Sequence, residues 1–385
     1  MGKKKIVFLA STAFIYNDAF FPVLLYLASI GVETRIFFET QRSLKAVKSS
    51  TSLWSWLNKY AGDIVCFEGT CRYVTINNLI HKARKTYFML SVIFCKEAIV
   101  FSPPHKKRFN SILDMFSNVW YYYAYAGFDL TERKNLVKGL TSKQRIFTGK
   151  HLRPPKPIKV EFFKKMIFLS LDKEFFNERY IWDKRLIIPY PLMQSWWHGF
   201  VKENPPKYHR KEMVGESGFI TIIMIMKGLC FFENGSDVDV LLDEIISAIR
   251  KYYPDTLIVI KPKGHDRKYW LDDDALSNRY QDKNIVITHD ALMSLSCKTA
   301  FAVSTGQSSG NYYMLSRGVP VIEYCRYSEG WREIFPKETA IEEYGGVFVK
   351  DIKSLEACIK DIMNHKVDLA KLKEKIGYKD IKLDI

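Results

Sequence analysis

The stretch Ser304-Thr-Gly-Gln-Ser-Ser-Gly-Asn-Tyr-Tyr-Met-Leu-Ser-Arg-Gly-Val-Pro-Val-Ile322 decides the fold of this 385-residue chain. An apolar run from Thr299 to Val303 precedes it and predicts a buried strand. Small hydroxyl and glycine residues follow, then a short helical pattern that Gly318 ends, and then a second apolar run over residues 319–324. A strand that leads into a serine- and glycine-rich turn at a helix N-terminus favours anion binding, because backbone N–H groups and the helix dipole attract negative charge.

Strand and helix patterns alternate along the rest of the chain as well. The sequence predicts strands at residues 6–10, 34–38, 63–67, 98–101, 144–147, 166–170, 218–226, 257–260, 284–288, 300–303 and 319–324, with a last one near Phe348. It predicts helices at residues 20–31 and 238–253, and two more within residues 354–376. A strand–helix–strand series of this kind predicts parallel sheets covered by helices.

The length of the chain is too great for a single ordinary domain. We predict an N-terminal Rossmann-like acceptor domain over residues 1–190, a connection over residues 191–217 and a C-terminal Rossmann-like donor domain over residues 218–385. The expected fold class is α/β of the GT-B kind, in which two Rossmann-like domains with parallel sheets face a central cleft. Ligands then bind beyond the carboxyl ends of the strands.

Composition narrows the class of protein. The net charge of +16 would attract nucleic acid, an anionic membrane surface or a phosphorylated substrate, although a solvated basic surface is the plain alternative. The seven cysteines are scattered without a CxxC pair, which predicts reduced core residues of a cytoplasmic protein. Lys96 and Glu97 interrupt the longest apolar region, so we expect no transmembrane helix and at most peripheral contact with an inner membrane.

Two basic segments are candidates for that peripheral contact. Residues 153–165 and 371–382 carry many positive charges, and Leu372, Ile376 and Ile381 make the second segment mildly amphipathic. Docking on an anionic membrane is one interpretation. A solvated helix face is the other.

His265 follows an expected buried strand, in the segment Lys261-Pro-Lys-Gly-His265. Pro262 stiffens this turn and Gly264 permits an unusual backbone angle. A histidine at such a strand end can donate a hydrogen bond to a phosphate or carboxylate. The alternative is an ordinary surface histidine in a basic loop.

Hydroxyl groups crowd the expected helix start after Ser304. Capping needs one hydroxyl, whereas four hydroxyls and two glycines favour phosphate binding. Glu323, at the end of the next strand, could bind ribose hydroxyls or be a plain edge residue. The predicted donor-binding residues are Lys261, Lys263, His265, Ser304, Thr305, Gly306, Gln307, Ser308, Ser309 and Glu323.

Two carboxylates are candidates for catalysis, together with His265. Glu233 and Asp237 follow the first strand of the second half, where a carboxylate can act as a base or as a nucleophile toward an anomeric carbon. The alternative is that Asp237 only begins a helix. In the first half, the loop after the first strand offers the candidate acceptor-binding residues Ser11, Thr12, Asn17 and Asp18.

Motifs of other nucleotide-binding classes are missing from the sequence. It contains neither GxGxxG nor GxxxxGK[ST], which argues against dinucleotide enzymes and P-loop NTPases. Asp272-Asp-Asp274 lies in a polar segment typical of solvated charge. We therefore expect no metal site and no cofactor, with a nucleotide sugar bound as a substrate.

The strand ends described above resemble two motifs of bacterial CMP-sugar glycosyltransferases. That group includes sialyltransferases, polysialyltransferases and the β-Kdo transferases of capsule and O-antigen synthesis. Lys261-Pro-Lys-Gly-His265 resembles the Lys-Pro-His-Pro motif, with the second proline missing and the histidine displaced. Ser308 and Ser309, in register with Gly318-Val-Pro320, resemble the serine motif, and Tyr313 stands where a glutamate is frequent.

A third element resembles the retaining β-Kdo transferases alone. Glu233-x-x-x-Asp237 is similar to their Gln-x-x-x-Asp element, with glutamate in place of glutamine. There the aspartate is expected to attack the anomeric carbon. The resemblance as a whole covers mainly residues 218–335, and the first half is similar in fold pattern only.

The resemblance implies a glycosyltransferase of bacterial surface polysaccharide synthesis, for a capsule or a lipopolysaccharide O-antigen. Its donor would be a CMP-activated ulosonic acid, Kdo or a nonulosonic acid, and its acceptor a glycan or lipid-linked glycan at the inner membrane. His265 and the serine pair would hold the donor phosphate. Asp237 would be the nucleophile or base, supported by Glu233.

Several alternatives stay open. A transferase that uses a UDP- or GDP-sugar, a CDP-polyol phosphotransferase and a sugar-nucleotide epimerase share the fold. A basic nucleic-acid-binding protein is the alternative from another class, although the sequence carries no RNP motif, helix-turn-helix signature or zinc finger, and we expect no nucleic-acid partner. The altered Lys-Pro segment also leaves room for an inactive relative.

Overall fold

The structure is a computed structural model. It describes residues 5–10, 17–70, 73–94, 98–101, 119–123, 161–169, 180–188, 191–214, 218–224, 238–262, 278–280, 284–329, 332, 337–364, 367–375 and 378–381. Only the backbone is described at residues 5–10, 17–20, 98–101, 119–123, 161–169, 180–188, 309 and 363.

The chain divides into two compact units. Unit 1 comprises residues 1–126, 159–207 and 378–385, and unit 2 comprises residues 127–158 and 208–377. These bounds differ from our predicted ranges, because residues 191–207 belong to unit 1 and the chain returns to unit 1 at residue 378. The acceptor and donor roles of the two halves stay predictions.

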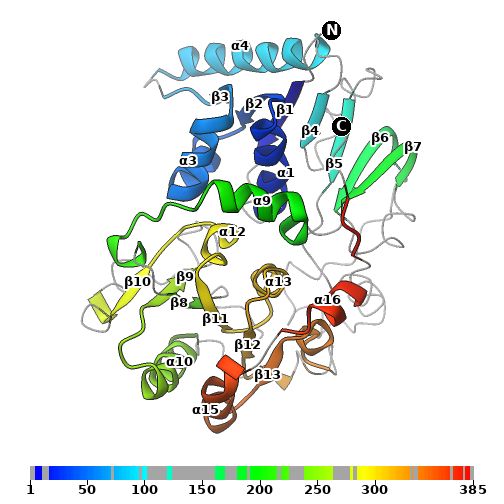
Figure 1. The fold of residues 1–385 in the computed structure, drawn as a ribbon. Helices are drawn as coiled ribbons and strands as arrows, with labels where there is room; N and C mark the ends of the chain where they lie inside the picture. Colours follow the sequence, from blue (N-terminus) through cyan, green and yellow to red (C-terminus); the bar gives the residue numbers. More distant parts are fainter. Residues whose placement is uncertain are drawn as a thin grey trace. The chain divides into compact units, whose positions relative to one another are not determined.

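Unit 2 is built on a six-stranded sheet whose neighbouring strands all run parallel. The order is β10-β9-β8-β11-β12-β13 (Figure 1). The strands are β8 (Phe219–Ile223), β9 (Ile258–Lys261), β10 (Ile285–Ile287), β11 (Thr299–Ser304), β12 (Val321–Tyr324) and β13 (Val347–Val349). The chain adds strands outward on one side of β8 and then begins again at β11 on the other side, which is the Rossmann order.

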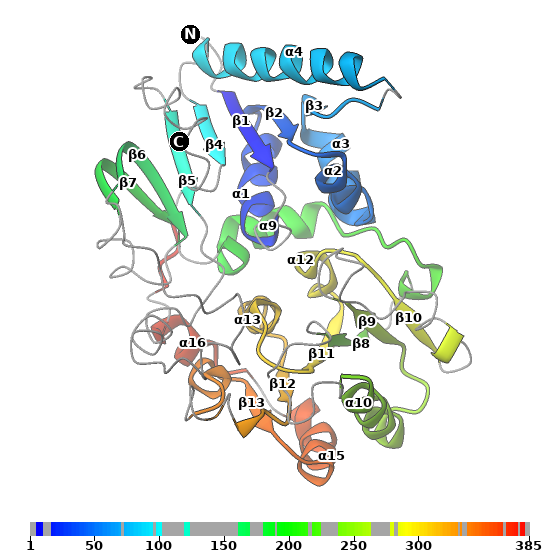
Figure 2. The same cartoon turned by 180° about the vertical axis from the view of Figure 1, so that it is seen from behind.

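Helices cover both faces of this sheet. α10 (Val238–Tyr252) and α15 (Ile352–Asp361) pack on one face, over Ile222, Ile260 and Val303. α12 (Leu292–Leu295) and α13 (Ser309–Ser316) lie on the other face (Figure 2). Because both faces are covered, the strands are nearly continuous apolar runs. Short helical segments complete the unit, namely η4 (Lys211–Met213), η6 (Ile341–Tyr344), η7 (Ile362–Asn364) and α16 (Leu369–Lys375).

Unit 1 contains two parallel sheets. The first has the order β1-β2-β3 and the second the order β4-β5-β6-β7. β4 lies alongside β1 in both views (Figures 1 and 2). The strands are β1 (Lys5–Ala10), β2 (Glu33–Phe38), β3 (Asp63–Cys66), β4 (Ala98–Phe101), β5 (Val119–Tyr123), β6 (Glu161–Leu169) and β7 (Tyr180–Ile188).

Aromatic contacts hold the helices of unit 1 to one another and to the first sheet. The edge of the Trp56 ring meets Trp197, with centroids 5.9 Å apart, which joins α3 to α9. Phe88 of α4 meets Phe37 of β2 at 5.1 Å in the same edge-on manner. The helices are α1 (Asn17–Ser29), α2 (Gln41–Lys48), α3 (Thr51–Tyr60), α4 (Val74–Ile93), η3 (Pro191–Met193) and α9 (Ser195–Glu203).

The predicted α/β class with parallel sheets is confirmed in both units. The arrangement of the two units across a cleft stays a prediction. The predicted strand at residues 144–147 lies outside the described residues. The sequence did not predict β5 or β7, and α9 forms within the range that we predicted as a connection.

Three further predictions concern cysteines and membranes. Among the described residues, Cys66, Cys297, Cys325 and Cys358 carry free thiols. No helix in the described part of the chain is long and apolar enough to cross a membrane. Leu372 is fully buried where α16 packs on η6 and α13, so this residue of the basic tail is not available to a membrane surface.

Candidate functional site

The strand order of unit 2 reverses between β8 and β11. Ligands of open α/β sheets bind at the carboxyl edge beside such a reversal. At this edge, the register places Ile223 of β8 between Lys261 of β9 and Ser304 of β11. Glu323 of β12 is the register partner of Ser304 on the other side. Three of the predicted donor-binding residues therefore lie in one row across the strand ends.

Backbone hydrogen bonds on two sides hold the loop between β11 and α13 in place. Gly306 has a φ of 145°, a value that favours glycine. The Thr305 N–H donates to the carbonyl oxygen of Ile223 at 3.1 Å. The Gln307 N–H donates to the hydroxyl of Tyr327 at 2.7 Å. The loop is thus held to β8 on one side and to the segment after β12 on the other.

Ser308 caps α13. Its Oγ accepts a hydrogen bond from the Gly310 N–H at 3.2 Å, so the capping alternative holds for this serine. The hydroxyl keeps its own proton, which it can still donate to a ligand oxygen. The backbone N–H groups that remain candidates for binding an anion are those of Gly306, Ser308 and Ser309.

Gly310 lets α13 come close to the sheet edge. A Cβ atom at this position would lie 2.7 Å from Leu292 Cδ1 in α12 and 3.3 Å from Ile223 Cγ2 at the end of β8. A larger residue would force either the buried Leu292 side chain or the start of the helix to move. The glycine therefore seats the positive end of the helix dipole at the carboxyl edge of the sheet.

Glu323 is fully buried and accepts hydrogen bonds from two side chains. Asn311 Nδ2 of α13 donates to its Oε2 at 3.0 Å, and the Tyr327 hydroxyl donates to its Oε1 at 2.7 Å. Burial, and then the neighbouring charge of Glu323, raises the pKa of Tyr327 well above its usual value, so the hydroxyl keeps its proton. These contacts tie α13 to β12, and ribose binding by Glu323 stays a prediction.

Two buried polar atoms stand out in this region. Within the described part of the chain, Ser304 Oγ and Asn311 Oδ1 are buried and have no hydrogen-bond partner. A buried polar atom without a partner lowers the free energy of unfolding by about 1–3 kcal/mol. Such atoms are rare in folded proteins, and a bound ligand that supplies the missing partner is one explanation. Lys261, which is 6% exposed, contributes a positive charge to the same row.

The remaining candidate residues cannot be placed in the site. Asn17 and Asp18 form the first turn of α1 in unit 1, described by backbone alone. The residues that lie outside the described ranges are Ser11, Thr12, Glu233, Asp237, Lys263 and His265. The chain reaches Glu233 and Asp237 after β8, and His265 after β9, which are the strands at and beside the reversal.

Sequence reasoning missed two members of the site, Asn311 and Tyr327. The signal that could have revealed them is Glu323 itself, because a carboxylate inside the run Val321-Ile-Glu-Tyr324 must be paired when it is buried. The amide of Asn311 and the hydroxyl of Tyr327 are the donors that meet this need. Both follow from three-dimensional contacts and not from a motif.

A metal centre has no support among the residues that the structure describes. No group of three or more histidine, cysteine, aspartate or glutamate side chains there could hold a metal ion. The donors at the sheet edge are hydroxyls, an amide, backbone N–H groups and one ammonium, which suit an anion better than a cation.

No protein-family profile and no curated protein matches the chain. Similar solved structures include S. aureus MnaA with UDP, which is 10% identical over 98% of this chain and 91% of that chain, with a TM-score of 0.49. The glycosyltransferase SnogD from Streptomyces nogalater is 12% identical over 97% and 93%, with a TM-score of 0.48. UGT89C1 of Arabidopsis thaliana with UDP is 10% identical over 97% and 94%, with a TM-score of 0.47. At these values we base the function on the chain's own residues.

Proposed function

We propose that the chain is a glycosyltransferase that takes its sugar from a nucleotide donor. The phosphate of the donor binds at the carboxyl edge of the unit 2 sheet, between the end of β11 and the start of α13. The observation that carries this proposal is the buried Ser304 Oγ, which has no partner among the described residues and lies beside the anion-binding end of a helix.

The chemistry of sugar transfer fits such an edge. As the bond between the anomeric carbon and the phosphate oxygen breaks, the electron pair stays on the phosphate and its negative charge grows. Donors that are already in place stabilise this charge without rearranging. The positive end of α13, the hydroxyl proton of Ser308 and the ammonium of Lys261 supply donors and positive charge here.

The finer assignment rests on the motif resemblance. We propose a CMP-activated ulosonic acid, Kdo or a nonulosonic acid, as the donor and a glycan of a bacterial surface polysaccharide as the acceptor. His265 would add a donor to the phosphate, and Asp237, supported by Glu233, would act as base or nucleophile at the anomeric carbon. Their positions in the chain, after β9 and β8, are consistent with these roles.

Nucleotide binding tests the proposal through Ser304. In the protein without nucleotide, Ser304→Ala removes a buried hydroxyl that has no partner among the described residues, so the free energy of unfolding should stay constant or rise. Loss of one hydrogen bond to a charged phosphate should weaken nucleotide binding by about tenfold or more. Calorimetric titration with CMP, CDP, UDP and GDP measures the affinity, and urea unfolding measures the stability.

Ser316→Ala is the matched control, because Ser316 lies at the other end of α13 and its hydroxyl donates to the Tyr313 carbonyl. It should leave nucleotide affinity unchanged. CMP-selective binding that Ser304→Ala weakens supports the CMP-sugar assignment. UDP- or GDP-selective binding overturns that assignment and keeps the transferase. Binding of no nucleotide overturns the proposed function.

A further inference from the structure

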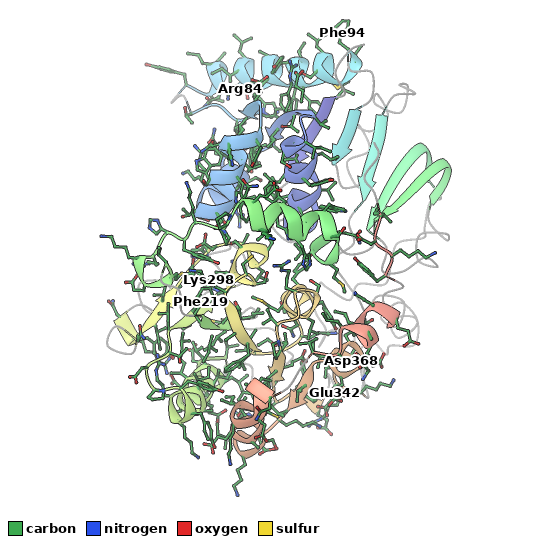
Figure 3. All side chains as sticks on the ribbon, viewed as in Figure 1. Arg84, Phe94, Phe219, Lys298, Glu342 and Asp368 are labelled. Atoms are coloured by element: carbon green, nitrogen blue, oxygen red, sulfur yellow. The ribbon has the colours of Figure 1, made fainter. Side chains whose placement is uncertain are left out.

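α4 exposes a stripe of mainly apolar residues along its length. Large apolar residues on its outer side keep substantial solvent exposure, for example 69% at Leu79 and 44% at Leu90. The spacing of three and four residues places the members of the stripe on one side of the helix. The apolar members of the stripe are Ile76, Leu79, Ala83, Leu90 and Ile93, and Thr86, whose hydroxyl donates to the Lys82 carbonyl, lies between Ala83 and Leu90. Phe94, directly after the helix, is 80% exposed and extends the stripe (Figure 3).

The opposite side of α4 anchors the helix to unit 1. Phe88 and Val92 are fully buried, and the Phe88 ring packs on Phe37 and Phe67. Arg84 donates to the carbonyl oxygens of Cys66 at 2.7 Å and of Glu68 at 3.1 Å. The orientation of the helix is therefore fixed by its inner contacts, and the outer stripe is free of any packing role in them.

The stripe is long enough to act as one surface. The seventeen residue-to-residue steps from Ile76 to Ile93 advance about 26 Å along the helix axis at 1.5 Å per residue. Single exposed apolar residues are ordinary, but exposed apolar residues aligned along one side of a helix mark a place where a partner binds.

The charges of α4 identify the kind of partner. The helix contains no acidic residue, and besides Arg84 on its inner side it carries Lys82 and Lys85. Lys82 is exposed and stands three residues after Leu79, at the side of the stripe. A helix with an apolar face and flanking basic residues is the form that lies in the headgroup region of an anionic membrane.

We propose that α4 docks unit 1 on an anionic lipid bilayer, with the helix lying in the plane of the surface and its apolar stripe inserted among the lipids. A second copy of the chain is a poorer partner, because two α4 helices in contact would bring their lysines together with no carboxylate in either helix to pair with them. The proposal is independent of the function proposed above, since it concerns unit 1 and the phosphate site belongs to unit 2.

Vesicle co-sedimentation tests the proposal with the full chain. Vesicles of equal parts phosphatidylglycerol and phosphatidylcholine should bind the protein, and vesicles of phosphatidylcholine alone should bind it weakly. The double variant Leu79→Ser with Leu90→Ser should raise the dissociation constant by about tenfold or more, because each leucine loses its transfer out of water. Lys82→Glu should weaken binding by about tenfold, and added salt should weaken it further.

Two control variants distinguish binding through α4 from nonspecific binding by exposed apolar residues or by positive charge elsewhere. Val240→Ser removes an exposed apolar residue from α10 of unit 2, and Lys353→Glu reverses an exposed lysine of α15. Both should bind vesicles as the wild type does. Circular dichroism melting and nucleotide titration should be unchanged in the leucine variant, which shows that unit 2 still works.

Vesicle binding that the leucine variant leaves unchanged overturns the proposal, and so does wild-type protein that binds no anionic vesicle. Sedimentation equilibrium tests whether α4 instead binds a second copy of the chain. A wild-type dimer that the leucine variant dissociates would show that α4 binds a second copy and would also overturn the proposal.

Discussion

Tyr327→Phe should destabilise unit 2 more than its single lost oxygen suggests. The Tyr327 hydroxyl donates to Glu323 Oε1 at 2.7 Å and accepts from the Gln307 N–H at 2.7 Å. Phenylalanine fills the same space and removes both hydrogen bonds at once. The ring itself is 1% exposed, so water cannot easily replace the hydroxyl.

The magnitude follows from what the substitution leaves behind. A buried group that loses its partner costs about 1–3 kcal/mol, and a charged group costs more. The buried carboxyl of Glu323 and the partly buried N–H of Gln307 together predict a loss of about 2–4 kcal/mol. Glu323 keeps the hydrogen bond from Asn311, which holds the expected loss below the sum of the largest values.

Urea unfolding at neutral pH measures this loss, with Tyr253→Phe as the matched control. Tyr253 also belongs to unit 2, its ring packs on Phe301 at 5.6 Å, and burial alone raises the pKa of its hydroxyl. The control should change the free energy of unfolding by less than about 0.5 kcal/mol. A Tyr327→Phe protein as stable as the control would refute the reasoning, because the two hydrogen bonds would then contribute nothing to stability.

Two further predictions concern packing and pH. Gly310→Ala should cost about 1–3 kcal/mol, because its Cβ would lie 2.7 Å from Leu292 Cδ1, whereas Gly199→Ala in α9, with nothing within 4 Å of its Cβ, should gain about 0.5–1 kcal/mol; urea unfolding that gave both the same sign would contradict this. Burial, and then the hydrogen bond to Glu244, raises the pKa of Tyr324. Its contribution to stability is therefore complete below the usual tyrosine pKa of about 10 and declines as the pH rises above it. Tyr324→Phe should flatten the alkaline fall in unfolding free energy, and an unchanged slope would exclude this group as its cause.

The strands of unit 2 were predictable because each one is a short apolar run between turn residues. A run such as Ile258-Val-Ile260 is buried on both faces, and short apolar runs between turn residues are typical of parallel strands. The sequence placed β9, β11 and β12 within two residues of their observed bounds. The order of the strands was not predictable in this way, because it depends on which edges meet in space.

Unit 1 shows why other elements escaped prediction. β7 carries Asp183, Lys184 and Arg185 in its middle, which interrupts the apolar pattern of a strand. α9 has two tryptophans and a glycine near a proline-rich segment, which suggested a connection. Its burial depends on partners far away in sequence, such as Trp56 in α3. No local pattern in α9 could have revealed that contact.

The sequence predicted several of the residues that lie at the site but not their hydrogen bonds. The row formed by Lys261, Ser304 and Glu323 follows from motif position, because all three lie at or directly after the end of a predicted strand. The sequence could not show how many hydrogen-bonding groups of this loop are already paired within the protein. The capping of α13 by Ser308 and the pairing of the Gln307 N–H are internal hydrogen bonds that a string of hydroxyls and glycines does not reveal.

The pairing of these backbone N–H groups within the protein affects which nucleotide the loop can bind. The loop before α13 is rich in hydroxyls, yet the N–H groups of Thr305, Gln307 and Gly310 are already paired within the protein. Among the residues that the structure describes, the backbone N–H groups that remain lie around the start of one helix, where they can surround a single phosphate group. A CMP-linked sugar carries one phosphate and a UDP-linked sugar carries two. A single phosphate at this helix start fits the CMP-sugar donor proposed above, and CMP is the nucleotide with which the titrations should begin.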